Sequence, residues 1–145
     1  MSLCNRWSSV VLSAAILLTG QQALAEGDLT LRPVKLPNLV LGTEDNRYYL
    51  SQTRYELVTG KSYKLKIIAS GQTEYAIRAP GFFQSIFLRK VEAGGMEIKA
   101  TSLTELEFEQ EGTAEIFFVP VKTGEFEFYS AGFEEKGMKG VFSVK

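Results

Sequence analysis

Histidine is absent from the 145-residue chain. Because imidazole is the commonest general base in enzymes and a frequent metal ligand, its absence excludes histidine-based catalytic triads and metal sites built on imidazole. The sequence also contains no phosphate-binding loop, zinc-binding spacing or dinucleotide fingerprint. Abundant acidic residues leave a catalytic carboxylate pair open, but their abundance does not indicate one. The residues therefore favour a protein that is not an enzyme and that has no cofactor.

The N-terminal segment, residues 1–25, has the pattern of a secretory signal peptide. Arg6 precedes a short apolar run, Val10–Leu18, and small residues at Ala23–Ala25 predict cleavage before Glu26. The alternative is that the segment stays attached as an anchor. The apolar run is shorter than the roughly 18 residues of a membrane span, and no later run reaches that length. We therefore expect export to the periplasm of a Gram-negative cell, with an extracellular location also open.

The only cysteine, Cys4, lies within this segment. Its loss would leave a domain of residues 26–145 without a disulfide, although the destination is oxidising. About 120 residues suffice for one domain with its own hydrophobic core. Removal of Arg6 leaves 15 basic and 17 acidic side chains. This balance does not have the basic character of a nucleic-acid-binding protein.

The remaining sequence alternates apolar and polar residues with a period of two, which predicts β-strands. The residues Leu29–Leu36 are predicted as a first strand, with Pro33 marking an edge or a bulge. The segment Pro37–Gln52 has no clear period and is expected to be a long loop or a short helix. Glycine-containing turns separate further strands predicted at Tyr63–Ile67, Leu103–Glu109, Ile116–Val119, Glu125–Phe128 and Val141–Val144. Short strands at this spacing are typical of a β-sandwich or barrel.

The C-terminal sequence FFVPVKTGEFEFYSAGFEEKGMKGVFSV, residues 117–144, resembles the cupredoxin superfamily. Members of this superfamily end with an aromatic strand, a copper-ligand loop and a Gly-Met-x-Gly segment. In this sequence Phe126 and Phe128 match the strand, whereas Gly137, Met138 and Gly140 match the closing segment. The resemblance extends more weakly to residues 63–91. It implies an all-β, Greek-key sandwich or barrel of cupredoxin type.

The same resemblance implies that the copper ligands have been lost. The cysteine and histidine positions of the ligand loop are occupied by Ser130 and Phe133, and only the methionine position, Met138, is kept. The first histidine position falls on Gln84, or on Phe83 in another alignment. A blue-copper ion needs two histidines and a cysteine thiolate in addition to a weak axial ligand. We therefore expect a degenerate copper site and no blue-copper electron transfer.

Three interpretations of these residues remain open. The first is a non-catalytic binding or assembly module whose protein partner docks on an apolar surface formed by Phe82, Phe83, Phe133 and Met138. In the second, these side chains turn inward and fill the space that copper would occupy. The third is copper or iron handling related to electron transfer, through a non-standard site or one completed by a partner. Glutamates at alternate positions 105–111, and at 125 and 127, are expected to form solvated strand faces.

Overall fold

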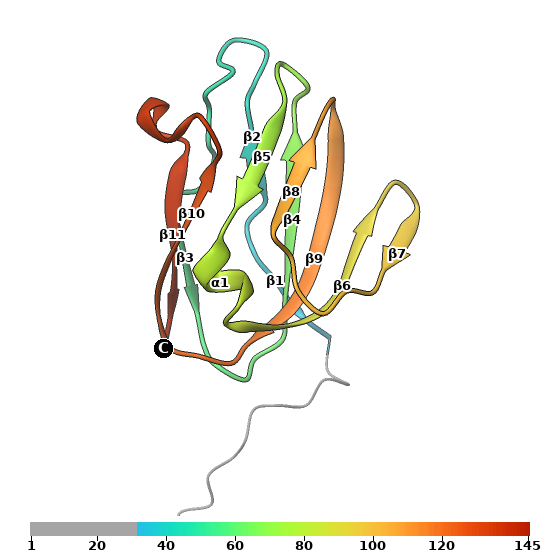
Figure 1. The fold of residues 1–145 in the computed structure, drawn as a ribbon, viewed down its shortest axis with the longest axis vertical. Coiled ribbons are helices and arrows are strands. Elements are labelled where there is room, and N and C mark those ends of the chain that lie inside the picture. The colour runs from blue at the N-terminus through green and yellow to red at the C-terminus, as the bar shows by residue number, and fades with distance from the viewer. Residues whose placement is uncertain (1–31) are drawn as a thin grey trace, which may run out of the picture.

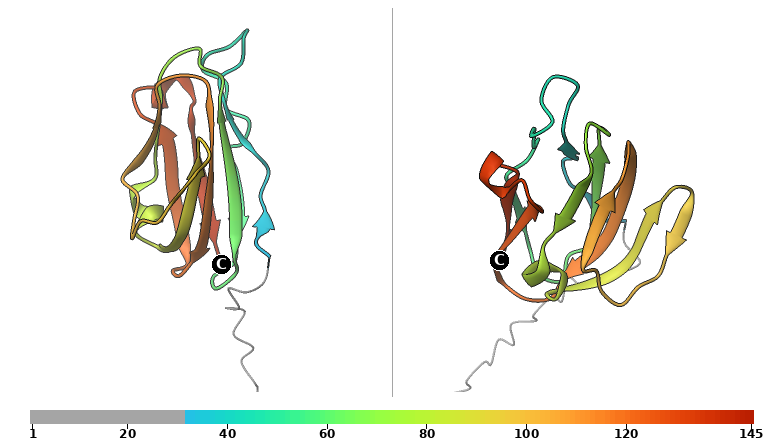
Figure 2. Two further views of the ribbon diagram at one scale, coloured as in Figure 1. Left: turned by 90° about the vertical axis from the view of Figure 1, so that its right-hand side faces the viewer. Right: turned by 45° about the horizontal axis from the view of Figure 1, so that its top comes forward.

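The protein is a sandwich of two mixed β-sheets packed face to face (Figures 1 and 2). The computed structural model describes residues 32–145. The predicted signal peptide, residues 1–25, and the start of the predicted domain lie outside the described residues. Within residues 32–145, no helix combines the length and the apolar character that a membrane span requires.

The first sheet has six strands in the order β1-β4-β9-β6-β7, and β2 also pairs with β4. The short strands β1 and β2 run parallel to β4, whereas the other pairs are antiparallel. The strands of this sheet are β1 (Val34–Lys35), β2 (Leu39–Leu41), β4 (Tyr63–Ala69), β6 (Ile86–Ala93), β7 (Met96–Ile98) and β9 (Gly112–Pro120).

The second sheet has five strands in the order β3-β11-β10-β5-β8. Strand β3 runs parallel to β11, and the other neighbours are antiparallel. Its strands are β3 (Arg54–Leu57), β5 (Tyr75–Arg78), β8 (Glu105–Phe108), β10 (Gly124–Ser130) and β11 (Lys139–Val144). A one-turn helix, α1 (Pro80–Phe83), connects β5 of this sheet to β6 of the other.

An aromatic cluster holds the two sheets together. The ring of Phe82, on α1, stacks on Phe142 of β11 at a centroid distance of 4.0 Å and meets Phe118 of β9 edge-on at 5.3 Å. Phe128 of β10 packs against Phe142 at 4.8 Å. Since aromatic rings bury large areas and prefer such offset or edge-on contacts, this cluster is a major part of the hydrophobic core.

The period-two pattern identified most of the long strands correctly. In β4 the residues Tyr63, Leu65, Ile67 and Ala69 are buried, and the side chains between them are less buried. The predictions for β8, β9, β10 and β11 are likewise confirmed, with bounds that differ by a few residues. The predicted loop or helix at Pro37–Gln52 is wrong in part, because it contains β2. This strand has only three residues, too few to show a period.

The sandwich has two ends that are formed by different elements (Figure 1). The β10–β11 loop (residues 131–138) lies at what we call the loop end, together with the β2–β3 loop (residues 42–53). Helix α1 lies toward the opposite end, which we call the helix end. Predicted site residues can act together only if they lie at the same end of the sandwich.

Candidate functional site at the loop end

The β10–β11 loop folds back on itself and brings three of the predicted ligand positions together. The N–H of Ser130 donates to the carbonyl of Met138 at 2.9 Å, and the N–H of Phe133 donates to the carbonyl of Ser130 at 3.0 Å. The N–H of Met138 donates in turn to the carbonyl of Phe133 at 3.2 Å. Gly137 ends the 3-10 helix η1 (Glu134–Lys136) with a φ of +88°, a conformation that glycine adopts without strain. The loop is therefore closed by its own backbone.

Ser130 is fully buried at the base of this loop. Its hydroxyl oxygen has no hydrogen-bond partner among the described residues. Leaving a buried hydroxyl unpaired costs about 1–3 kcal/mol in desolvation. An unpaired hydroxyl at this position would weaken the fold, and it is the backbone of Ser130 that takes part in closing the loop.

The side chain of Phe133 packs into an aromatic cap over the loop end. Its ring lies 5.3 Å from the ring of Tyr48, in the β2–β3 loop, and 6.2 Å from that of Tyr75, on β5. The Tyr75 hydroxyl donates to the carbonyl of Arg47 at 2.8 Å. Gly42, with a φ of +72°, lies against this hydroxyl, and a Cβ atom at that position would collide with it. Phe133 is partly buried and belongs to the edge of the hydrophobic core.

The groups at the loop end do not fit a blue-copper ion. Met138 supplies a thioether that is fully buried, Ser130 supplies a neutral hydroxyl and Phe133 supplies a ring without a lone pair for coordination. A blue-copper ion requires two imidazoles and a thiolate, and the sequence contains no histidine. Within the described part of the chain, no three His, Cys, Asp or Glu side chains are grouped to hold a metal ion.

The structure contradicts the assignment of Gln84, or of Phe83, to the first ligand position. Both residues lie at the helix end. There the centroid of the neighbouring Phe82 ring is 6.1 Å from that of the Phe126 ring. Phe126 precedes Ser130 by four residues along β10, which at a rise of about 3.3 Å per residue is about 13 Å. The error arose because the hydrophobic sequence around Gln84 resembles a strand with a ligand, whereas it forms α1 and the start of β6.

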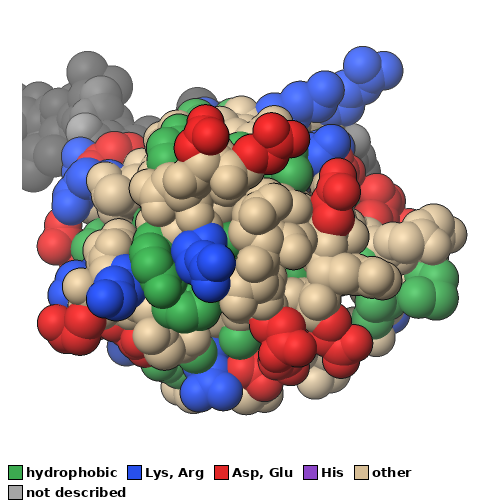
Figure 3. Space-filling view, turned by 90° about the horizontal axis from the view of Figure 1, so that it is seen from above, with side chains coloured by type: hydrophobic (Ala, Val, Ile, Leu, Met, Phe, Trp, Pro, Cys, Tyr) green, Lys and Arg blue, Asp and Glu red, His purple; other side chains and the backbone are tan. Residues whose placement is uncertain are grey.

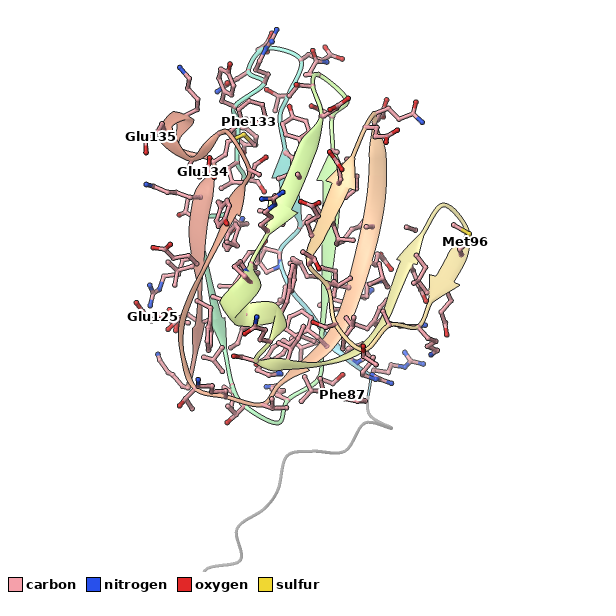
Figure 4. All side chains as sticks on the ribbon, viewed as in Figure 1. Phe87, Met96, Glu125, Phe133, Glu134 and Glu135 are labelled. Carbon is pink, nitrogen blue, oxygen red and sulfur yellow. The ribbon has the colours of Figure 1, made fainter. Side chains whose placement is uncertain are left out.

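The expected partner surface formed by Phe82, Phe83, Phe133 and Met138 is also wrong as a single exposed patch. Phe82, Phe83 and Met138 are buried, with 2%, 4% and 0% of their surfaces exposed. Phe82 and Phe83 belong to α1 at the helix end, and Met138 belongs to the β10–β11 loop at the other end (Figure 1). Phe133 lies at the loop end as well (Figure 4). Viewed from the loop end, the visible hydrophobic side chains form small separate areas among charged groups of both signs (Figure 3). The inward-turned interpretation agrees with the burial of Met138 and the partial burial of Phe133. Phe82 and Phe83 also turn inward, but they pack at the helix end and do not fill a space at the loop end.

Tyr48 and Tyr75 are the residues of the loop end that the sequence did not identify. Tyr48 lies in a long loop without periodicity, and only the tertiary fold brings it to Phe133. Tyr75 begins the short strand β5, in which Tyr75 and Ile77 are buried and Ala76 and Arg78 are less buried. This brief alternation was the one sequence pattern that could have placed Tyr75 on the inner face.

Two of the glutamates that alternate along the predicted strands, Glu105 and Glu125, are paired with basic side chains. Glu105 on β8 accepts a hydrogen bond from Arg78 on β5 at 2.7 Å, and this carboxylate raises the pKa of Arg78. Arg54 on β3 contacts Glu125 at 2.7 Å. Glu109 and Glu111 lie beyond the end of β8 and are exposed. Since these pairs lie on the surface, each contributes little to stability.

No protein-family model matches the chain, and no curated protein does. Its structure is similar to solved multicopper oxidases. One from Campylobacter jejuni, described as a metallo-oxidase, has a TM-score of 0.54 and 13% identity over 79% of this chain and 31% of that one. A variant of one from Aquifex aeolicus has a TM-score of 0.58 and 13% identity, covering 77% and 29% of the two chains.

A copper nitrite reductase from Nitrosomonas europaea is similar as well, with a TM-score of 0.52 and 10% identity over 66% of this chain and 33% of that one. Such likenesses at low identity show the fold, which is a cupredoxin-like β-sandwich. The chain spans less than half the length of each of these proteins. It spans 44% of another multicopper oxidase of similar structure. The similarity therefore does not show that this chain has the activity of any of these proteins.

Proposed function

We propose that this protein is an exported cupredoxin-fold module that binds a protein partner, catalyses no reaction and works without a blue-copper centre. The observation that supports the metal-free part of the proposal is the packing of the β10–β11 loop, at positions that the resemblance assigns to copper ligands. Phe133 is engaged with Tyr48 and Tyr75, and Met138 is buried in the core. A partner that supplied missing metal ligands would have to displace these side chains to reach the thioether.

Thermal melting of the purified protein in the presence of Cu(I) or Cu(II) tests the metal-free part of the proposal. A ligand that binds only the folded state stabilises it by about 2.7 kcal/mol at a concentration one hundred times its Kd. We expect no rise in Tm with either ion and no copper retained after purification. A stoichiometric rise would overturn the proposal and would support the copper-handling alternative, with Met138→Leu as the variant that tests the thioether.

A gain-of-ligand variant serves as the positive control for this titration. The double substitution Ser130→Cys and Phe133→His would place a thiol and an imidazole beside Met138 in a loop whose backbone already brings these positions together. We expect this variant to acquire copper-dependent stabilisation that the unmodified protein lacks. The comparison shows whether the loop geometry is suited to a metal once the donor chemistry is supplied.

Chemical cross-linking of the exported protein in intact cells tests the binding part. We expect a discrete adduct whose yield saturates with expression level and falls when unlabelled protein competes. An exported β-sandwich of unrelated sequence provides the control for nonspecific cross-links. If no competable adduct forms, the partner-binding role is refuted even when the copper titration is negative.

A further inference from the structure

Strand β7 ends the first sheet with one side unpaired among the described residues. It pairs only with β6, in the register Val91 with Ile98 and Ala93 with Met96. The β6–β7 hairpin stands away from the body of the sandwich (Figures 1 and 2). An exposed strand edge presents free N–H and C=O groups to which another strand can add.

The turn of the hairpin determines which backbone groups of β7 are free. Gly94 and Gly95 have φ angles of +56° and +79°, which are the signs required by a two-residue type I′ turn. In such a hairpin the two residues that flank the turn, Ala93 and Met96, are hydrogen-bonded to each other. Further along the strands, pairs without hydrogen bonds alternate with pairs that have them. Met96 and Ile98 therefore direct their N–H and C=O groups toward β6. Those of Glu97, and of Lys99 if the strand continues, point to the free side.

The side chains of this edge divide into an apolar and a charged face. Met96 and Ile98 lie on the face that continues the core, yet 63% and 42% of their surfaces are exposed. On the other face, the Glu97 carboxylate accepts from the Lys90 ammonium at 2.8 Å and contacts the Lys99 ammonium at 2.8 Å. The edge thus combines uncovered hydrophobic side chains with one negative and one positive charge on either side of Ile98.

We propose that β7 is the site at which a second copy of this chain adds, antiparallel, to form a symmetric dimer centred on Ile98. Three registers about a twofold axis place free backbone groups opposite one another. Pairing centred on Glu97 would oppose two glutamates, and pairing centred on Lys99 would oppose two lysines. Only pairing centred on Ile98 opposes Glu97 of each copy to Lys99 of the other, so the sequence Glu-Ile-Lys is complementary to itself.

In this register both the backbone and the apolar face are satisfied. The N–H of Glu97 donates to the carbonyl of Lys99 in the second copy, and the reciprocal bonds form by symmetry. The two Ile98 side chains meet on the twofold axis beside Met96. Because β7 has three residues, the contact is small, and the dimer is weak and dependent on concentration. This interface is independent of the proposed metal-free binding role, since neither requires the other.

Sedimentation velocity of the purified protein, from micromolar to millimolar concentrations, tests the proposal. We expect a monomer–dimer equilibrium in the unmodified protein. Lys99→Glu opposes two glutamates at each contact, and Glu97→Lys opposes two lysines, so each variant alone should dimerise at least about tenfold more weakly. An equal mixture of the two variants should recover dimers, because each lysine-bearing chain then faces a glutamate-bearing one.

Glu127→Lys is the matched control for charge. It reverses an exposed glutamate on β10, a central strand paired on both sides, and should leave the equilibrium unchanged. Thermal melts of every variant establish that each one is folded. The proposal is overturned if the unmodified protein stays monomeric at all concentrations. It is equally overturned if the single reversals leave the dimer intact, or if the mixture fails to restore it.

Discussion

Replacing Ser130 by alanine is expected to stabilise this protein, although the residue is completely buried and lies at the base of the loop that defines the candidate site. Its hydroxyl has no hydrogen-bond partner among the described residues. Removing an unpaired buried hydroxyl relieves a desolvation cost of about 1–3 kcal/mol. The missing oxygen leaves a void of roughly 12 Å³, which at about 24 cal/mol per Å³ costs only about 0.3 kcal/mol. The net gain is therefore about 0.7–2.7 kcal/mol.

Urea denaturation followed by far-ultraviolet circular dichroism measures this gain. The only tryptophan, Trp7, lies in the predicted signal peptide, so tryptophan fluorescence does not report on residues 26–145. We expect a higher midpoint with an unchanged m-value, and a rise in Tm of about 4 °C for each kcal/mol gained. The backbone bonds of residue 130 to Met138 and Phe133 do not involve its side chain and are retained.

Ser51→Ala is the matched control for this prediction. The Ser51 hydroxyl donates to the carbonyl of Asn38 at 2.9 Å and accepts from the N–H of Val40 at 2.7 Å. Loss of these bonds should destabilise the protein by about 1–2 kcal/mol. If Ser130→Ala destabilises the protein to the same extent as Ser51→Ala, the Ser130 hydroxyl is satisfied in solution and the reasoning is refuted.

Two further predictions concern the aromatic cap and the hairpin. Phe133→Ala should lower the free energy of unfolding by about 2 kcal/mol, roughly half the cost for a fully buried phenylalanine. In contrast, Phe87→Ala, which removes an exposed ring, should change it by less than about 0.5 kcal/mol in urea denaturation. An effect at Phe133 as small as at Phe87 would favour a docking role instead. The ammonium groups of Lys90 and Lys99 lower the pKa of Glu97 from 4.5 to about 2. Because its folded-state pKa is depressed, the stabilising contribution of Glu97 is present above pH 4.5 and is lost as the pH falls toward 2. The stability difference between the unmodified protein and Glu97→Gln, measured by denaturation at several pH values, should shrink over that window. A constant difference would contradict the lowered pKa of Glu97.

The strands that the sequence revealed are those with one buried face and enough residues to show it. In Tyr63–Ala69 each apolar residue alternates with a more exposed one, because successive side chains of a strand point to opposite faces of the sheet. Among the described residues, the strand predicted at Leu29–Leu36 is present only as β1, Val34–Lys35, and β2 was not predicted. They have two and three residues and form by pairing alongside β4, a contact that joins distant parts of the chain.

The candidate site was predictable only where its members are close in the sequence. Ser130 ends β10, Phe133 and Met138 lie in the loop that follows it, and backbone hydrogen bonds join all three. The choice of Gln84 failed because it required knowing which end of the sandwich residue 84 reaches. That end depends on the direction in which β5 leaves the loop end and on the turn of α1, neither of which has a local pattern.

The sequence by itself determined the sandwich class of the fold, because alternation, turn residues and the aromatic C-terminal strand are local properties. It also determined that no imidazole is present anywhere in the chain. Only the tertiary structure decided that Phe133 packs with Tyr48 and Tyr75, and that Phe82 joins the two sheets through Phe118 and Phe142. Burial and ring contacts depend on pairing between strands remote in sequence, and no single segment encodes which of its apolar side chains will be covered.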